Sequence, residues 1–473
     1  TCSTGWGTEP GMIALFFLLP ILSGGLLVHL FWPDRRPTGL VLQACLGVGI
    51  GLGLNSLSYF AFLSFFAGRH WFLAVQIGLF AILLAANILR RRPPERPAPA
   101  PAPARLSRTQ TVLLAFSALV FVVSLVSTAS YILRRRQGDW DAWMMFNRAA
   151  RFVYRDQTGW LASFSPRMDP IFHADYPLFL ALNIASGWDA LGSETPHVPM
   201  VQSALFALAC AGLLVSALAA TRSVGQAALG LIVLWGTPAV VNEGARELAD
   251  LPLAFFFLAT AVLIYLFLLE RRPGLLVLAG LAAGLSAWMK NEGSVFVIAG
   301  GLAVVLLFLR QKPWLMLGRY AAGAALPLAV VLYFKLFLAP PSDVLSNAPG
   351  RSIAQALDPS RHLEILRFLG SELLRFGGWS VAGLPVGVLL VLAIYLLLAR
   401  QPRAPEQQPM LVAAAVLAGV QLLGAYAAYL ITPYDLTWHL TYSVERIVLQ
   451  VFPLLAFAML SAAQPPETIF QGK

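Results

Sequence analysis

Long apolar runs, separated by short polar segments, extend over almost the whole chain. Many reach the roughly 20 residues that a helix needs to cross a bilayer, and together they predict about 13 transmembrane helices. The runs lie at 11–31, 39–64, 72–90, 111–133, 198–220, 226–242, 251–269, 275–289, 294–309, 315–337, 380–399, 409–431 and 448–464. The stretch 176–188 is too short to cross unaided, so we expect it to be re-entrant or interfacial. The pattern predicts an all-α polytopic membrane protein.

The composition agrees with this fold class. The chain is 58% hydrophobic and only 12% charged, whereas about a quarter of a soluble domain is charged. The net charge of +10 does not predict a nucleic-acid partner, because Arg and Lys accumulate in the cytoplasmic loops of membrane proteins. Contact of these cations with membrane lipids stays open. Cys2, Cys45 and Cys210 are too few and too scattered for a disulfide framework or a zinc site.

A basic, Pro/Ala-rich stretch at 91–110 follows the third apolar run. Its composition predicts an extended linker, and the arginines beside it place it in the cytoplasm. The other short loops on that side carry Arg35, Arg36, Arg222, Arg271, Arg272, Arg310, Lys312, Arg400 and Arg403. We expect the N-terminus outside and the C-terminus inside, with a three-helix transmembrane segment (1–90), the linker, a core (111–464) and a C-terminal tail (465–473).

The remaining polar segments fall on the opposite, outer side in this topology. They contain every histidine except His29. Two of them are the long loops 134–197 and 338–378, and shorter motifs lie at 242–250, 288–293 and 432–446. A helix bundle whose polar residues served only to keep its two ends in water would carry such residues on both sides of the membrane. We therefore predict a functional site on the outer face.

The segment GDWDAW (138–143) places two carboxylates just beyond an apolar run. Asp141, or its neighbour Asp139, is a candidate general base, because a carboxylate can accept the proton of a hydroxyl nucleophile. Asp141 also suits the first turn or N-cap of the helix predicted over 143–156. A purely structural role for this residue therefore stays open.

The helix over 143–156 has apolar residues on one side and arginines on another, which is typical of an amphipathic helix on a membrane surface. Arg148 and Arg151 are candidates for contacts with a substrate phosphate or with lipid phosphates. Trp143 offers an aromatic face to a sugar or a lipid.

The motif NEGARELAD carries charges where two predicted helices meet. Arg246, Glu247 and Asp250 are candidate substrate-binding residues. The structural alternative is a solvated helical turn, because Glu243 and Glu247, like Arg246 and Asp250, are four residues apart.

WMKNEG (288–293) places Lys290 and Glu292 between two apolar runs with almost no loop. A charge at membrane depth is unfavourable by roughly 2.5–3.5 kcal/mol on insertion scales, so it indicates a functional site. Lys290 suits an anion such as phosphate. The alternative is a lysine that extends its ammonium group to the membrane surface.

Two other outer motifs add polar and aromatic residues to this face. HADYPL carries Asp175 and Tyr176, and TPYDLTWHLTYSVER carries His439 and Arg446. His439 is alternatively a lone hydrogen-bonded ring at the membrane interface. Histidines and carboxylates can bind metals, but no spacing here selects one, so no metal is assigned.

Taken together, WDAW with its NRAARF helix, HADYPL, ELADLPLAFFFLA, WMKNEG and TPYDLTWHL resemble the GT-C superfamily of integral-membrane glycosyltransferases. The resemblance extends over about 111–464 and is strongest to bacterial relatives of dolichyl-phosphate-mannose:protein mannosyltransferases and of lipid A aminoarabinose transferase. Three predicted spans precede the part that is similar to the family.

The resemblance implies inverting transfer of a sugar from a polyprenyl-phosphate carrier to a hydroxyl of a lipid, glycan or protein acceptor. It places the enzyme in a bacterial inner membrane with its site on the periplasmic face. Asp141 matches the position of the base, with Asp139 as the neighbour that could replace it. Lys290 and Arg246 match positions expected to meet the donor phosphate. The donor is the lipid-linked sugar itself, and no separate cofactor is implied.

Two other functions stay open. A flippase or transporter of lipid-linked sugars would carry internal repeats with paired broken helices, and no repeat is recognisable. A ligase that moves a whole glycan would favour a large outer loop rich in Arg and His, and the loop 338–378 has that composition.

Overall fold

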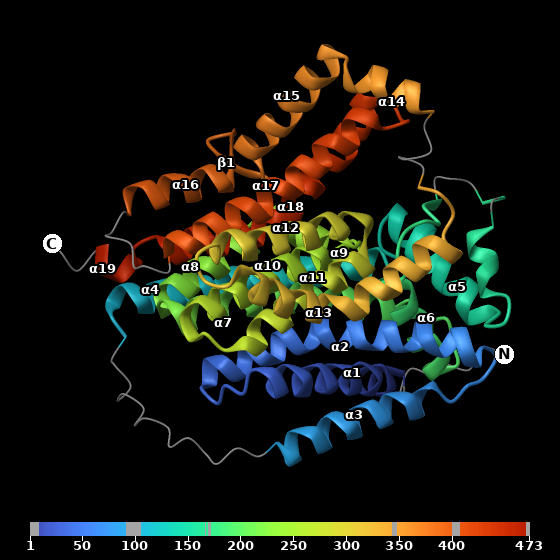
Figure 1. Ribbon diagram of the computed structural model, residues 1–473. Helices are drawn as coiled ribbons and strands as arrows, with labels where there is room; N and C mark the ends of the chain where they lie inside the picture. Colours follow the sequence, from blue (N-terminus) through green and yellow to red (C-terminus); the bar gives the residue numbers. More distant parts are fainter. Residues whose placement is uncertain are drawn as a thin grey trace.

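The computed structural model describes residues 9–90, 106–165, 167–168, 172–342, 348–399 and 407–469. In this part of the chain, nine helices are long and apolar enough to cross a membrane, or ten if one bent pair counts as a single span. The nine helices, shown in Figure 1, are α1 (Glu9–Phe31), α2 (Pro37–Phe66), α3 (Phe72–Leu89), α4 (Arg108–Arg134), α7 (His197–Thr221), α10 (Asp250–Glu270), α13 (Pro313–Tyr333), α17 (Gln407–Ile431) and α18 (Leu436–Ala462). The prediction of a helical polytopic membrane protein is confirmed.

The bent pair corresponds to the predicted span 226–242. It consists of α8 (Val224–Trp235) and α9 (Pro238–Ala245), which meet at an angle of 65°. The single helix expected here is wrong, because Pro238 disfavours a helical conformation at the preceding residue, and Thr237 is extended. Ser124 donates a hydrogen bond to the carbonyl oxygen of Trp235 (2.6 Å), which replaces part of the helical bonding lost at the break.

Three apolar helices are shorter than a full span: α11 (Pro273–Met289), α12 (Asn291–Leu307) and α16 (Val388–Leu398). The expected helix 380–399 is wrong in its first part, where β1 (Trp379–Val381) and β2 (Leu384–Val386) form an antiparallel hairpin. Ala382 and Gly383 both have positive φ, which a two-residue hairpin turn requires. That α11, α12 and α16 also cross the membrane stays a prediction.

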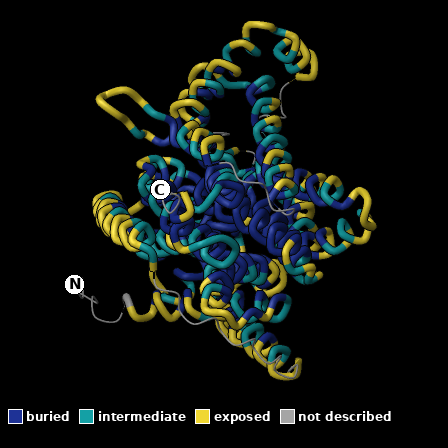
Figure 2. Tube along the Cα trace, turned by 90° about the vertical axis from the view of Figure 1, so that its left-hand side faces the viewer, coloured by how far each residue is buried: buried dark blue, intermediate teal, exposed yellow. Residues whose placement is uncertain are grey.

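Helix α10 forms the centre of the bundle. All its residues from Asp250 to Leu268 are buried, and it packs against α7, α11 and α18. The first three helices are integral to this bundle, because α2 also packs against α7. Helix α4 lies at the edge and contacts mainly α8 and α9. Figure 2 shows the buried centre and the exposed outer surfaces of the peripheral helices.

Short helices cover one end of the bundle. A π-helical turn (Ala142–Phe146) leads into α5 (Asn147–Arg155), which confirms a helix at the predicted position. Helix α6 (Phe179–Leu191), in the stretch expected to be re-entrant or interfacial, is buried against α2, α5 and α7. The remaining short elements are the 3₁₀ turn Trp160–Phe164, the π turn Phe334–Leu338, α14 (Pro349–Ala356) and α15 (Pro359–Arg375). Helix α19 (Pro466–Ile469) lies at the other end of the bundle, where Glu467 accepts a hydrogen bond from Gln110 at the start of α4 (3.0 Å).

The junctions between α1 and α2 and between α7 and α8, which carry basic residues, lie at the opposite end of the bundle, where α4 begins (Figure 1). Arg36 forms an ion pair with Glu270 (3.0 Å) at the junction of α1 and α2, and Arg222 donates to the carbonyl oxygen of Ala463 (2.9 Å). Most of the linker, Arg400, Arg403, Cys2, the stretch 343–347 of the long loop and the last four residues lie outside the described residues.

Candidate functional site

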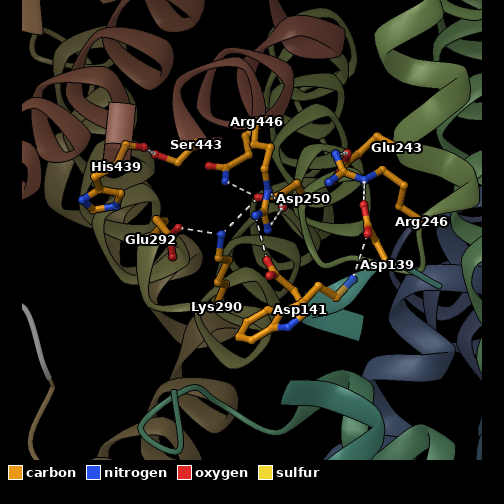
Figure 3. Close-up of polar contacts among 12 residues, drawn as sticks. Asp139, Asp141, Glu243, Arg246, Asp250, Lys290, Glu292, His439, Ser443 and Arg446 are labelled. Atoms are coloured by element: carbon orange, nitrogen blue, oxygen red, sulfur yellow. Dashed lines mark hydrogen bonds and ion pairs between the residues drawn. The ribbon is translucent and has the colours of Figure 1, made fainter. Parts of the chain in front are cut away.

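The centre of the candidate site is the buried carboxylate of Asp250, the first residue of α10. It accepts hydrogen bonds from Lys290 Nζ (3.1 Å), Gln450 Nε2 (2.7 Å) and Arg446 Nε (2.8 Å). Its own exposure is 0%. Figure 3 shows Lys290 and Arg446 converging on this carboxylate from different parts of the chain. One carboxylate therefore holds two cations in fixed positions away from water.

The helix ends explain how these groups meet. Asp250 lies in the first turn of α10, where a negative charge is favoured by the helix dipole. Lys290 is the extended residue between α11 and α12. Gly293 lets the two helices approach closely, because a Cβ at this position would lie 2.0 Å from the carbonyl oxygen of Ser286.

Arg446, on α18, connects the buried centre to GDWDAW. Its NH2 group contacts Asp250 Oδ2 (2.7 Å), and its NH1 group contacts Asp141 Oδ2 (2.7 Å). The side chain of Asp141 is 23% exposed, whereas that of Asp250 is fully buried. Asp141 takes the N-cap position in the first turn, as predicted, but its side chain makes no capping hydrogen bond there and bonds to Arg446 instead. The network thus runs from the protein interior to a partly exposed carboxylate.

Asp139 belongs to a neighbouring cluster. Arg246 Nε donates to Asp139 Oδ2 (2.7 Å), and Arg246 NH1 donates to Glu243 Oε2 (3.1 Å). Burial favours the protonated form of Asp139, but hydrogen bonds from the Trp140 backbone and from Arg246 outweigh it and hold the pKa below its usual value. The solvated helical turn considered for this segment is wrong. Glu243 and Asp250 are buried, and Arg246 pairs with Asp139 and Glu243 instead of with Asp250.

Gly138 allows GDWDAW to close over this cluster. Its φ is +71°, and an added Cβ would lie 2.6 Å from the carbonyl oxygen of Arg246. The same oxygen accepts a hydrogen bond from the Asp139 backbone N–H (3.0 Å). The glycine therefore fixes where both aspartates of the motif lie.

We predict that Gly138→Ala destabilises the protein by about 1 kcal/mol or more, because the added methyl group would lie too close to the Arg246 carbonyl oxygen and the residue must keep a positive φ. Thermal unfolding in detergent measures the effect. Gly78→Ala is the matched control, since nothing lies within 4 Å of the position of its Cβ. Equal stability in the two variants would contradict the prediction.

Glu247 is a second buried carboxyl beside GDWDAW. Its φ is +60°, and neither oxygen has a well-aligned hydrogen bond within the described part of the chain. Burial raises the pKa of Glu247 to about 8, and the amide of Asn147 opposes this only in part. The folded state holds the proton of Glu247 more tightly than the unfolded state does. The contribution of Glu247 to stability therefore falls as pH rises from the ordinary pKa of a glutamate in the unfolded chain through 8.

We predict that Glu247→Gln removes this loss and makes the protein more stable than the parent above pH 7, with a smaller difference at pH 5. Thermal unfolding in detergent between pH 5 and 9 measures it. Glu194→Gln is the control, because hydrogen bonds from Arg155 lower the pKa of Glu194, so its contribution is lost as pH falls. Parallel pH profiles for parent and Glu247→Gln would refute the assignment.

Lys290 has further partners on the side of HADYPL. Its Nζ contacts Glu292 Oε1 (2.8 Å) and lies 5.9 Å from the centre of the Tyr176 ring. The side chain is 8% exposed, so the alternative of a lysine reaching to the membrane surface is wrong. Glu292 and Tyr176 therefore join the site as predicted.

Asp175 forms an adjacent contact. It is buried and accepts hydrogen bonds from Asn291 Nδ2 (2.8 Å) and from Lys335 Nζ (3.3 Å). The sequence reasoning missed Lys335, Asn291 and Gln450. Gln450 and Lys335 lie inside predicted apolar spans, and a polar residue in such a span is the signal that could have found them.

Four further predicted residues take part neither in the network around Asp250 nor in the clusters of Asp139, Glu247 and Asp175 beside it. His439 Nδ1 bonds to Thr432 Oγ1 (2.9 Å), and Figure 3 shows it apart from Arg446. Arg148 donates to the Met144 carbonyl oxygen (3.0 Å). Arg151 contacts Glu194 (3.5 Å), and Trp143 is 41% exposed.

No group of three or more His, Cys, Asp or Glu residues that could hold a metal ion occurs within the residues described above. The site is instead an alternation of carboxylates and cations. Such an arrangement can bind a phosphate at its cations and take a proton at a carboxylate near its open side.

No protein-family model, no curated protein and no solved structure matches this chain. Its family therefore stays a prediction, and the geometry of the site carries the functional proposal.

Proposed function

We propose that the protein is an integral-membrane glycosyltransferase. It moves a sugar from a polyprenyl-phosphate carrier to a hydroxyl of an acceptor outside the cytoplasmic membrane, with inversion. The observation that carries the proposal is the shared arginine, Arg446, between buried Asp250 and partly exposed Asp141, beside Lys290. Three of these residues, Asp141, Asp250 and Lys290, lie in motifs similar to the GT-C superfamily, and Arg446 follows the motif TPYDLTWHL by six residues.

In this reaction a bond forms between the acceptor oxygen and the anomeric carbon, and the bond from that carbon to the phosphate oxygen breaks. Asp141 takes the proton of the acceptor hydroxyl. Arg446 and Lys290 stabilise the charge that develops on the departing polyprenyl phosphate. Asp250 is a positioning residue that holds the two cations, because it bonds to both.

The base is assigned to Asp141 in preference to Asp139. Asp139 lies against two arginines, Arg246 (2.7 Å) and Arg135 (3.7 Å), and hydrogen bonds from Trp140 and Arg246 hold its pKa below the usual value. The corresponding contact of Asp141 is with Arg446 (2.7 Å). Asp139 also bonds to Arg246 through both its backbone and its side chain. Its proposed role is to fix Arg246 as a second cation near the donor phosphate.

The proposal includes an orientation in a bacterial inner membrane. Arg36 and Arg272 pair with Glu270, which lies at the opposite end of α10 from Asp250, and basic loops favour the cytoplasm. The site then faces the periplasm, where the acceptor is a lipid, a glycan or a protein. Membrane lipids surround the outer helices.

Deletion of the gene, followed by mass spectrometry of lipids and surface glycans, tests the proposal. The expected result is a glycoconjugate that lacks one sugar and an accumulated polyprenyl-phosphate sugar, both reversed by the parent protein and not by Asp141→Asn. Loss of a whole glycan would favour a ligase. Rescue by Asp141→Asn would favour a flippase or transporter, because transport needs no base.

A further inference from the structure

A groove opens at the break between α8 and α9. It has a volume of about 430 Å³, within the roughly 300–1,000 Å³ typical of ligand pockets. One wall is α4, with Val123, Ser124 and Ser127, and the other is the bent pair, with Trp235, Gly236 and Asn242. The α4 positions are three or four residues apart, so they share one face of that helix.

The backbone carbonyl groups at the break between α8 and α9 do not make the groove polar, because they already accept hydrogen bonds. Ser124 donates to the Trp235 carbonyl oxygen (2.6 Å), and Trp379 donates to the Gly236 carbonyl oxygen (2.9 Å). The ring of Trp235 stacks on Phe121 at 4.8 Å. A groove at membrane depth with its backbone satisfied offers a surface for a hydrocarbon chain and few partners for a polar molecule.

Both walls end in arginines on the side of the candidate site. Helix α4 continues beyond Ser127 to its last residue, Arg134, about 10 Å further along at 1.5 Å per residue. Arg135 and Arg136 follow the helix, and all three arginines are exposed. Helix α9 leads from Asn242 to Arg246. Arg135 and Arg246 meet at Asp139, at 3.7 and 2.7 Å, which joins the end of the groove to GDWDAW.

We propose that this groove holds the hydrocarbon chain of a phosphate-bearing lipid, with the phosphate at the arginines where α4 and α9 end. The apolar lining fits the chain and the four arginines fit the anion. The inference rests on the proposed function in identifying this lipid as the sugar donor. It adds the path along which that donor reaches Arg246 and the site.

A polyprenyl-phosphate analogue with a photoreactive chain tests the groove directly in the full-length protein reconstituted in lipid nanodiscs. Labelling is expected on peptides that contain 119–127 and 235–242. Unlabelled polyprenyl phosphate should compete, whereas neutral polyprenol and inorganic phosphate should not. Labelling spread evenly over the outer helices, or equal competition by polyprenol, would overturn the proposal.

A pair of tryptophan variants supplies the matched control. Val123 lines the groove, and Val122 is equally a lipid-facing residue of α4 but does not line it. Val123→Trp and Ser127→Trp should lower groove labelling about tenfold, while Val122→Trp leaves it unchanged. Equal labelling in all three folded variants would contradict the inference.

The same samples separate the two proposals. Sugar transfer by the parent protein without labelling of the groove would overturn the lipid path and leave the glycosyltransferase standing. Labelling of the groove without transfer from any polyprenyl-phosphate sugar would overturn the proposed function and leave a phospholipid-like binding site.

Discussion

Replacement of Asp250 by asparagine is expected to destabilise the protein by about 3–5 kcal/mol, the range for breaking a buried ion pair. Asparagine keeps the shape but removes the buried charge that Lys290 and Arg446 share, so that each cation keeps only its second carboxylate, Glu292 or Asp141. We also expect turnover to fall by at least about a hundredfold, because the two cations proposed to bind the phosphate lose their position. Thermal unfolding and sugar transfer in the reconstituted protein measure the two effects.

Glu270→Gln is the matched control for this substitution. Glu270 also pairs with an arginine, Arg36, but it lies at the other end of the bundle and its side chain is 20% exposed. Loss of this pair is expected to cost roughly 1 kcal/mol or less. If Asp250→Asn proved as stable and as active as Glu270→Gln, the buried carboxylate would have neither of its assigned roles.

Asp141→Asn is expected to lower turnover about 10²–10⁴-fold, the range for loss of a general base. The protein should remain folded, because this side chain is partly exposed and only its contact with Arg446 is lost. Turnover and thermal unfolding, measured on the same reconstituted samples, separate loss of the base from loss of the fold.

Asp139→Asn is the companion variant two residues away. We expect it to keep more activity than Asp141→Asn, because its carboxylate fixes Arg246 instead of taking a proton. Loss of turnover only in Asp139→Asn would move the base to that residue. Unchanged turnover in Asp141→Asn would remove the base from Asp141 altogether.

The helices of this protein follow from the sequence where hydrophobicity alone decides the structure. The long runs that became α1, α4, α10 and α17 were predicted within a few residues. The hairpin at 379–386 was not, because Leu384 and Val386 are apolar enough to extend a hydrophobic run and the turn depends on the backbone of Ala382 and Gly383. Hydropathy does not register such local backbone geometry.

The site was predictable only in part. Lys290 stood out because a lysine between two apolar runs is costly unless it has partners. Its partner Asp250 and the shared Arg446 come from distant parts of the chain, and packing alone brings them together. Arg148, Arg151 and His439 carry suitable chemistry, yet their local contacts are with Met144, Glu194 and Thr432.

Transfer by the purified protein tests the central claim most directly. Radiolabelled polyprenyl-phosphate sugars from the native membrane would be supplied with an extract that contains acceptors. The account predicts that label moves to an acceptor with release of one polyprenyl phosphate per sugar, and that Asp141→Asn and Asp250→Asn abolish both. Absence of transfer by the parent protein, or equal transfer by both variants, would contradict it.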